Sequence, residues 1–237
     1  MRYYILVIAM LISFSSCLNY IARKAGVKSK IPIVTKLSVP NHDVLFLGMT
    51  HMRQQEFYDS AKKIIIDLKS KGFKVYAESA AKIVNNKIVF DSNYAKKARK
   101  IIGYDMTLPL EHDNSIIKAL IEKFELVKQP SYADLGAQDR EIVDVDYENL
   151  IDLYEKKYGE IILDSCDRKT DLGKAYYCET ATKASRKRFR KEYLLEKRNN
   201  FVVQKIKNSN EEKILLIYGW QHLKGIKKLL KKKNQAP

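Results

Sequence analysis

The hydrophobic positions of this chain fall into short continuous runs and into longer stretches with helical spacing. Residues 44–47 and 214–217 are four-residue apolar runs, which is the pattern of a strand buried on both faces. Residues 73–78 form a third strand-like run, and residues 32–39 alternate weakly, as an edge strand does. Residues 54–70 carry apolar side chains at helical spacing. The order strand, helix, strand predicts that strands 44–47 and 73–77 run parallel.

The remaining hydrophobic positions of the chain predict mainly helices. Helical spacing predicts further helices, whereas residues 132–135 fit a short strand or a loop. The predicted helices cover residues 93–102, 115–126, 147–157, 183–206 and 222–230. The fold class is therefore α/β, with a central, mostly parallel β-sheet flanked by helices. The length of 237 residues suits one large domain better than two small ones, and we expect a single domain over residues 31–231.

The first residues resemble an export signal rather than part of the fold. Residues 3–14 are an apolar run of signal-peptide length, and Ser15-Ser16-Cys17 follows like a bacterial lipobox. We expect a signal peptide over residues 1–16, a lipidated Cys17 and a tether over residues 18–30. The alternative is an uncleaved signal anchor with a buried cysteine. Both place the domain in the cell envelope, outside the cytoplasm, and residues 232–237 read as a flexible tail.

Export changes the interpretation of the other two cysteines. Cys166 and Cys178 can form a disulfide across a short polar loop in an oxidising compartment. The alternative is two unpaired thiols.

The chain has a formal net charge of +16. Much of the excess lies in residues 183–198 and 224–233. Aromatic residues do not alternate with these cations as a base-stacking surface requires, so we do not expect nucleic acid as a partner. A basic face near anionic lipid headgroups fits better, and the oligomeric state is not predicted.

One local device occurs twice: an apolar strand, a glycine, two further residues, a histidine and a helix. It occurs at Gly48–His51 and at Gly219–His222. With 9 glycines and 4 histidines in the chain, random placement gives this spacing roughly 0.15 times, so two occurrences exceed the number expected by chance. Ligands of α/β sheets bind beyond the carboxyl ends of the strands, where glycine permits a sharp turn or a close approach. We expect the two histidines to converge there.

Glu78 ends the strand after His51 and completes a candidate metal site. Two histidines and one carboxylate form a three-ligand set that leaves a position for water, and zinc, manganese, cobalt and iron all suit it. A divalent ion lowers the pKa of bound water and supplies a nucleophile for hydrolysis. The alternatives are structural histidines and a surface or salt-bridged glutamate. We expect His42 and His112 to be solvated; the alternative for His112 is that it approaches the site from a loop.

These motifs, with Lys-Gly-Phe-Lys-Val-Tyr-Ala-Glu at residues 71–78 and Ile-Tyr-Gly-Trp-Gln-His-Leu-Lys-Gly-Ile at residues 217–226, resemble the TraB/PrgY/GumN family. That family is grouped with TIKI proteases and with the erythromycin esterase and ChaN proteins. The resemblance implies a TIKI/ChaN-like domain with a metal-dependent hydrolase site at His51, Glu78 and His222. It also implies a role for Arg198-Asn199, where Arg198 would hold a substrate carboxylate or stabilise an oxyanion.

The acidic stretch around Asp144 and Asp146 also resembles a family segment, and we interpret Asp146 as a helix N-cap. The sequence thus predicts a metal-dependent hydrolase, with a peptidase as the leading interpretation. The alternative is a non-enzymatic protein that binds a small peptide or a haem-like ligand in the same cleft. A third, weaker hypothesis is a membrane-surface adaptor that uses the basic face.

Overall fold

The structure is a computed structural model that describes residues 19–22, 29–84, 87–89, 91–105, 108–109, 112 and 114–231. The expected signal peptide, Cys17 and the tail at 232–237 lie outside these residues. The chain divides into two compact units that are not contiguous in sequence. Unit 1 comprises residues 1–32, 50–66 and 110–138, and unit 2 comprises residues 33–49, 67–109 and 139–237.

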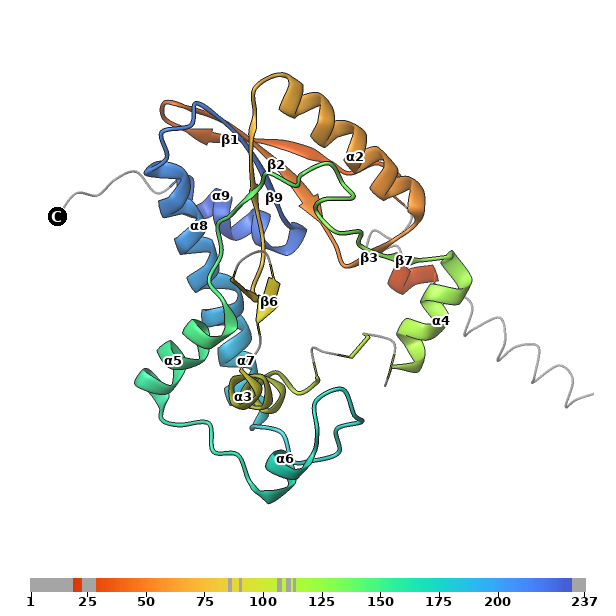
Figure 1. Ribbon diagram of the computed structural model, residues 1–237, viewed down its shortest axis with the longest axis vertical. Helices are drawn as coiled ribbons and strands as arrows, with labels where there is room; N and C mark the ends of the chain where they lie inside the picture. Colours follow the sequence, from red (N-terminus) through yellow and green to blue (C-terminus); the bar gives the residue numbers. More distant parts are fainter. Residues whose placement is uncertain are drawn as a thin grey trace, which may run out of the picture. The chain divides into compact units, whose positions relative to one another are not determined.

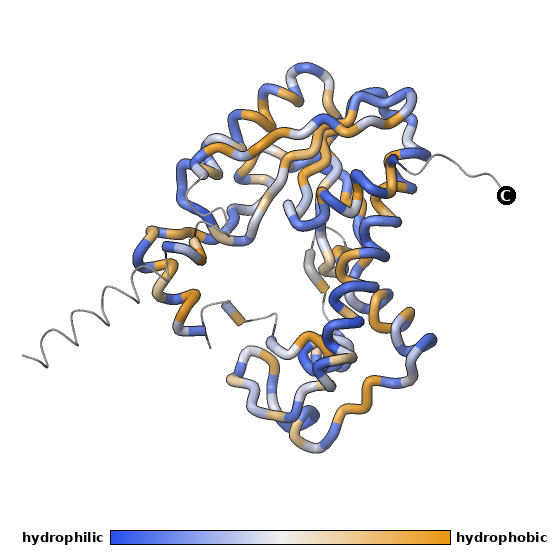
Figure 2. Tube along the Cα trace, turned by 180° about the vertical axis from the view of Figure 1, so that it is seen from behind, coloured by the Kyte–Doolittle hydropathy of each residue, from blue (hydrophilic) through white to orange (hydrophobic). Residues whose placement is uncertain are grey.

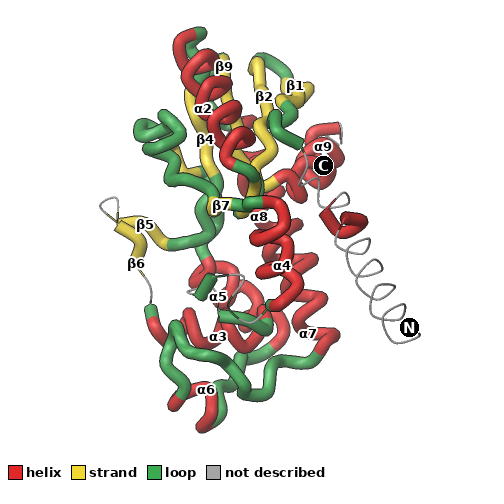
Figure 3. Tube along the Cα trace, turned by 90° about the vertical axis from the view of Figure 1, so that its right-hand side faces the viewer, coloured by secondary structure: helices red, strands yellow, loops and turns green. Residues whose placement is uncertain are grey.

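Unit 2 contains a five-stranded sheet in the order β1-β2-β9-β4-β8. Strands β2, β9, β4 and β8 run parallel to one another, and β1 is an edge strand that pairs antiparallel with β2. This confirms the α/β class and the mostly parallel sheet. It also confirms that β2 and β4 run in one direction, although β9 lies between them (Figures 1 and 3). The strand bounds are β1 Val34–Val39, β2 His42–Met49, β4 Lys74–Ala77, β8 Glu141–Ile142 and β9 Lys213–Gly219.

One face of the sheet packs against α8 (Arg198–Lys207) and α9 (Leu223–Lys231). Alternate residues of β9 point into this core, because successive side chains of a strand face opposite sides. The mostly hydrophobic colour of the strands in Figure 2 contrasts with the mixed colouring of α8. The core side chains come from four strands of the sheet, from the residue that directly follows β8 and from both helices: Leu37, Val44, Phe46, Tyr76, Val143, Val202, Val203, Ile206, Ile214, Leu216, Tyr218 and Ile226.

The predicted helix at 183–206 is one continuous helical stretch with a change of type inside it. It consists of α7 (Lys183–Arg188), the π-helix η1 (Phe189–Lys197) and α8. Figure 1 shows it running from the sheet to a group of helices. There Phe189 and Tyr193 pack against α3 (Ser92–Ile102) and α5 (Tyr147–Tyr158) in a second core. Asp146 caps α5, as predicted.

A disulfide joins Cys166 in α6 (Ser165–Lys169) to Cys178, with the two Cα atoms 5.8 Å apart. This confirms the disulfide predicted from the sequence. Unit 2 also contains a small hairpin of β5 (Lys82–Val84) and β6 (Lys87–Val89), which the sequence did not predict.

Unit 1 contains a second two-stranded sheet, in which β3 (Met52–Arg53) pairs with β7 (Val127–Lys128). It also contains α4 (Ser115–Phe124), which confirms the predicted helix there. Residues 132–135 are a turn rather than a strand. Helix α2 (Gln55–Ser70) confirms the helix predicted after the first motif, and its residues divide between the two units. Across the described ranges, no helix is long and apolar enough to cross a membrane.

Candidate functional site

The two glycine–histidine motifs begin on neighbouring strands. In the register of β2 and β9, Gly48 lies opposite Tyr218, and Met49 lies opposite Gly219. Both strands are parallel, so their carboxyl ends lie at the same edge of the sheet, where α/β proteins bind ligands. The predicted juxtaposition of the two strand ends is therefore confirmed. Neither glycine, however, lies in a sharp turn.

Gly219 is required for space. It has a φ of −53°, which any residue adopts. A Cβ atom on Gly219 would lie 2.9 Å from Glu78 Oε2 and 3.4 Å from His222 Cδ2. A Cβ atom on Gly48 would lie 3.2 Å from Trp220 Cβ. Each glycine thus makes room for a neighbouring segment of the same edge.

Glu78 follows β4 directly and is held on both oxygens. The backbone N–H of Gly219 donates to Oε2, and Arg198 Nη2 donates to Oε1 at 2.5 Å. The glutamate is thus salt-bridged, and the arginine comes from a helix 120 residues away in sequence. A carboxylate at the end of an apolar strand needs such partners when it is largely buried.

Arg198 in turn is shared between two carboxylates. Its Nε and Nη2 atoms donate to the two oxygens of Asp144 at 2.8 and 2.6 Å, and the Asp144 side chain is fully buried. Burial alone would lower the pKa of Arg198, but the hydrogen bonds and charge of Asp144 and the charge of Glu78 raise it well above its usual value. The guanidinium is therefore occupied by protein carboxylates. The role expected from the sequence, holding a substrate carboxylate or an oxyanion, is not the one that these contacts give it.

His222 lies in the short 3-10 turn η2 (Trp220–His222), so the last helix begins one residue later than predicted, at Leu223. Its ring is buried, with Nδ1 2.7 Å from Asn199 Oδ1 and Nε2 3.7 Å from Glu78 Oε1. With Asn199 in this orientation, Nδ1–H donates, and Nε2 carries the free lone pair towards Glu78. Burial lowers the pKa of His222 to about 4, so the ring is neutral at pH 7.

Asn199 is fixed by the close approach of two helices. A Cβ atom on Gly225 of α9 would lie only 2.2 Å from Asn199 Nδ2. Gly225 therefore lets α9 pack against the amide, which leaves Oδ1 directed at His222. Arg198 and Asn199 are adjacent and both buried, and they directly follow the π-helix η1. π-helical segments are rare and occur often at functional sites.

Two tyrosines extend the site. The Tyr218 ring meets the His222 ring edge-on, with centroids 4.8 Å apart. Its buried hydroxyl forms no hydrogen bond of ordinary geometry within the described part of the chain, although burial and the nearby Asp144 carboxylate raise the pKa of Tyr218. Burial, opposed by Arg198, raises the pKa of Tyr147 to about 12. Tyr147 N–H donates to Ala80 O at 2.9 Å, which links the segments that follow β8 and β4.

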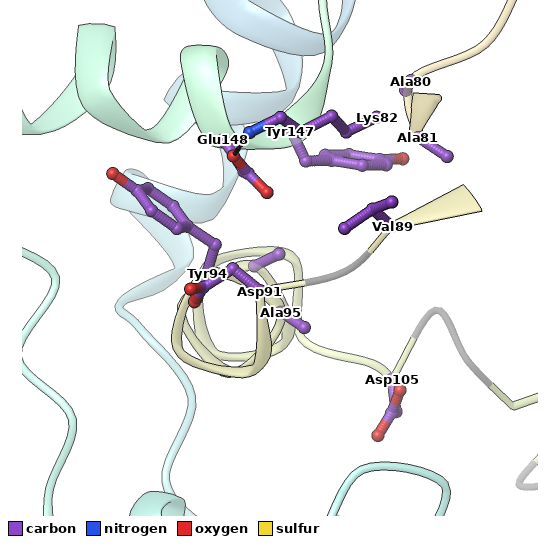
Figure 4. Close-up of a pocket in the computed structure, with 11 residues that line it drawn as sticks. Ala80, Ala81, Lys82, Val89, Asp91, Tyr94, Ala95, Asp105, Tyr147 and Glu148 are labelled. Carbon is purple, nitrogen blue, oxygen red and sulfur yellow. Dashed lines mark hydrogen bonds and ion pairs between the residues drawn. The ribbon is translucent and has the colours of Figure 1, made fainter. Parts of the chain in front are cut away.

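These two segments also line a small cavity of about 30 Å³ (Figure 4). Ala80 and Ala81 follow Glu78 in sequence, and Tyr147 and Glu148 follow Asp144. The cavity thus belongs to the same edge of the sheet. Its size suits a single small group.

The structure brings together Glu78, Arg198 and His222, three of the four residues nominated from the sequence. The fourth, His51, belongs to unit 1, where its carbonyl accepts a hydrogen bond from Gln129 N–H at 2.9 Å. Its place in the site stays a prediction. His42 is not a site residue, because it begins β2, at the opposite end of the strand from Gly48, and its Nδ1 lies 2.8 Å from Glu211 O. His112 is exposed and belongs to unit 1.

Sequence reasoning missed the roles of Asp144 and Tyr218. Asp144 lies in the acidic stretch that resembles a family segment, but the sequence predicted a role only for Asp146, as a helix N-cap. Tyr218 lies within the strand that carries the second motif, where it reads as one more core residue.

The donor chemistry fits a divalent ion at Glu78 and His222. Their facing atoms are 3.7 Å apart, close to the roughly 3.4 Å that separates two ligands of a tetrahedral zinc ion. A carboxylate oxygen has two lone pairs, so Oε1 can accept Arg198 and still donate to an ion. Within the described ranges, no group of three or more His, Cys, Asp or Glu side chains is placed to hold a metal.

Comparisons with known proteins do not assign the chain to a family. No protein-family model matches it, and neither a curated protein nor a solved structure matches it significantly.

Proposed function

We propose that this protein is a metal-dependent hydrolase with a TraB/TIKI-like site, acting on peptides outside the cytoplasm. The observation that carries the proposal is the geometry at the sheet edge, where a neutral, buried His222 presents Nε2 to the Glu78 carboxylate at 3.7 Å. Two donors of this kind, held at ligand spacing beyond parallel strands, support hydrolytic chemistry. His51, nominated by its sequence motif, is proposed as the further ligand.

The residues around the pair have positioning roles. Asn199 fixes the His222 ring and its tautomer, as carbonyl and carboxylate groups do for metal-binding histidines in general. Arg198, anchored by Asp144, fixes Glu78. When bound, the ion would supply Lewis-acid activation of water. Glu78 is either a ligand or the general base that accepts the proton of the attacking water.

Metal analysis of the protein tests the proposal. We expect about one equivalent of a divalent ion such as zinc, manganese or cobalt per chain, and a loss of at least about tenfold in occupancy in His222→Ala and His51→Ala. His42→Ala is the matched control, because His42 lies outside the site, and it should retain the metal. Equal metal content in all four proteins would refute the metal site.

Hydrolysis is tested separately with Glu78→Gln, which keeps the shape of the side chain but removes its charge. We expect the wild type to cleave a peptide library and Glu78→Gln to lose about 100-fold or more in rate. Haem titration addresses the alternative. A Soret shift that His51→Ala abolishes, together with no cleavage by the wild type, would replace the hydrolase with a ligand-binding protein.

Membrane anchoring at Cys17 is part of the same proposal and has its own test. Cells that express the protein should incorporate labelled palmitate into the wild type and not into Cys17→Ser. Equal labelling of both proteins would exclude lipidation at this cysteine.

A further inference from the structure

The first two segments of the long helix carry an excess of positive charge. Residues 183–197, which form α7 and η1, contain seven lysines and arginines and two glutamates. One of the two glutamates, Glu192, is already bound: Lys157 Nζ and the Tyr158 hydroxyl both donate to its Oε2, at 3.2 and 2.7 Å. The cations of this segment are therefore poorly compensated by the protein.

Several of these cations lie along one face. Lys183, Lys187 and Lys191 recur every fourth residue, and Arg190 follows Lys187 by three residues. Residues three and four apart are neighbours on a helix surface, so the four side chains lie on one side of the helix. All four side chains are exposed. None of them forms an ion pair with another described residue. We call these four residues the basic strip.

The aromatic residues of this helical segment do not lie beside the strip on the surface. Phe189 and Tyr193 of the same segment are buried, and they pack into the second core against α5. A surface for single-stranded nucleic acid combines cations with exposed aromatic rings on which bases stack. The strip offers cations alone, which suits a surface of phosphate groups.

A hollow adjoins the strip. It has a volume of about 440 Å³ and is lined by Lys157, Lys191, Glu192, Glu196, Lys197 and Asn200. Three lysines thus converge on one concave region. Its two glutamates make it less basic than the strip itself.

We propose that the basic strip is a docking surface for a membrane rich in anionic phospholipid, held by contacts between its cations and headgroup phosphates. Such contacts are long-range and screened by salt, and each lysine or arginine near an anionic bilayer contributes to the attraction. The inference is independent of the proposed hydrolase activity, because the strip shares no residue with the candidate site.

Vesicle flotation with the full chain tests this proposal. The probes are vesicles of phosphatidylcholine alone and vesicles containing about one-third phosphatidylglycerol. Any insertion of the apolar N-terminal residues into the bilayer would contribute to binding of both kinds of vesicle, so the difference between them measures the electrostatic part. We expect the wild type to bind the anionic vesicles at least about tenfold more tightly, and this preference to disappear near 0.5 M salt.

The variant Lys183→Gln/Lys187→Gln/Arg190→Gln/Lys191→Gln should lose the preference. The matched control, Lys62→Gln/Lys63→Gln/Lys118→Gln/Lys123→Gln, removes the same charge from exposed lysines of unit 1 and should keep it. Circular dichroism verifies that both variants fold. Equal loss in both variants would make the effect one of net charge and overturn the proposal, as would no loss in either. Binding of a DNA oligomer through the strip, without vesicle binding, would overturn the lipid assignment.

Discussion

The backbone N–H of Gly219 donates a hydrogen bond to the carboxylate of Glu78. The contact joins the second glycine–histidine motif to the end of the adjacent strand β4. It requires that residue 219 has no side chain, because a Cβ atom there would lie 2.9 Å from Oε2 of the same carboxylate. Glu78 can therefore occupy its position only because residue 219 is a glycine.

Gly219→Ala should therefore displace Glu78 and weaken the site. We expect a loss of metal affinity of about tenfold or more and a destabilisation of about 1–3 kcal/mol from overpacking. Isothermal titration calorimetry and urea unfolding measure the two effects. Gly48→Ala is the control, since its Cβ would meet Trp220 Cβ at the less severe distance of 3.2 Å. Identical effects of the two substitutions would contradict this account.

Arg198→Met should be among the most destabilising substitutions in unit 2. It leaves the fully buried Asp144 and the largely buried Glu78 without their cation. Breaking a buried ion pair from one side costs about 3–5 kcal/mol, because an uncompensated charge remains inside the protein. Urea unfolding measures the loss. Lys197→Met, at the exposed neighbouring position, should change stability by less than about 0.5 kcal/mol. A loss below about 1 kcal/mol for Arg198→Met would mean that water reaches the two carboxylates.

Part of this site could be predicted from the sequence, because the relevant signals are local. The apolar runs of β2 and β9 identified buried strands, and parallel strands place their carboxyl ends together. The glycine–histidine spacing then marked His222 and pointed to Glu78 at the end of β4. Each of these inferences needs only a few consecutive residues and the general geometry of α/β sheets.

The pairing of Arg198 with Asp144 could not be predicted in this way. The two residues are 54 positions apart, and β8, which positions Asp144, has only two residues, too few for a periodic pattern. The π-helix before Arg198 was also missed, because hydrophobic spacing predicts a helix but does not distinguish a wider turn. The sequence pattern identifies Asp146 as a helix N-cap. It gives no corresponding signal for Asp144, because the partner of Asp144 is Arg198, which is distant in sequence.

The metal-free protein should become less stable as the pH decreases, because the His222 ring becomes protonated. Its pKa of about 4 in the folded state lies below the usual 6.5, so the unfolded chain binds the proton more tightly between these values. The contribution of the neutral ring is complete above pH 6.5 and is lost as the pH falls towards 4, by about 2–3 kcal/mol between pH 7.5 and pH 4.5. Urea unfolding at pH 7.5 and 4.5 measures it.

His222→Gln removes the titrating ring and serves as the control for that experiment. Other ionisable groups are common to both proteins, so the wild-type loss should exceed the variant loss by about 2–3 kcal/mol. Parallel pH profiles for the two proteins would show that the ring is solvated and titrates near its usual pKa.

Tyr218 and Tyr176 provide a matched pair for the last prediction. Both carry a hydroxyl that Phe lacks, but only the Tyr176 hydroxyl forms a hydrogen bond of ordinary geometry, donating to Asp167 Oδ1 at 2.6 Å. Asp167 is fully buried, so Tyr176→Phe removes one of its donors and should cost about 1–3 kcal/mol. Tyr218→Phe removes a buried hydroxyl that forms no hydrogen bond of ordinary geometry within the described residues and lies near the Asp144 carboxylate, and it should be neutral within about 0.5 kcal/mol or stabilising. Thermal and urea unfolding compare the two variants. A cost above about 1 kcal/mol for Tyr218→Phe would show instead that the hydroxyl is hydrogen-bonded in the folded protein, either to Asp144 or to an ordered water molecule.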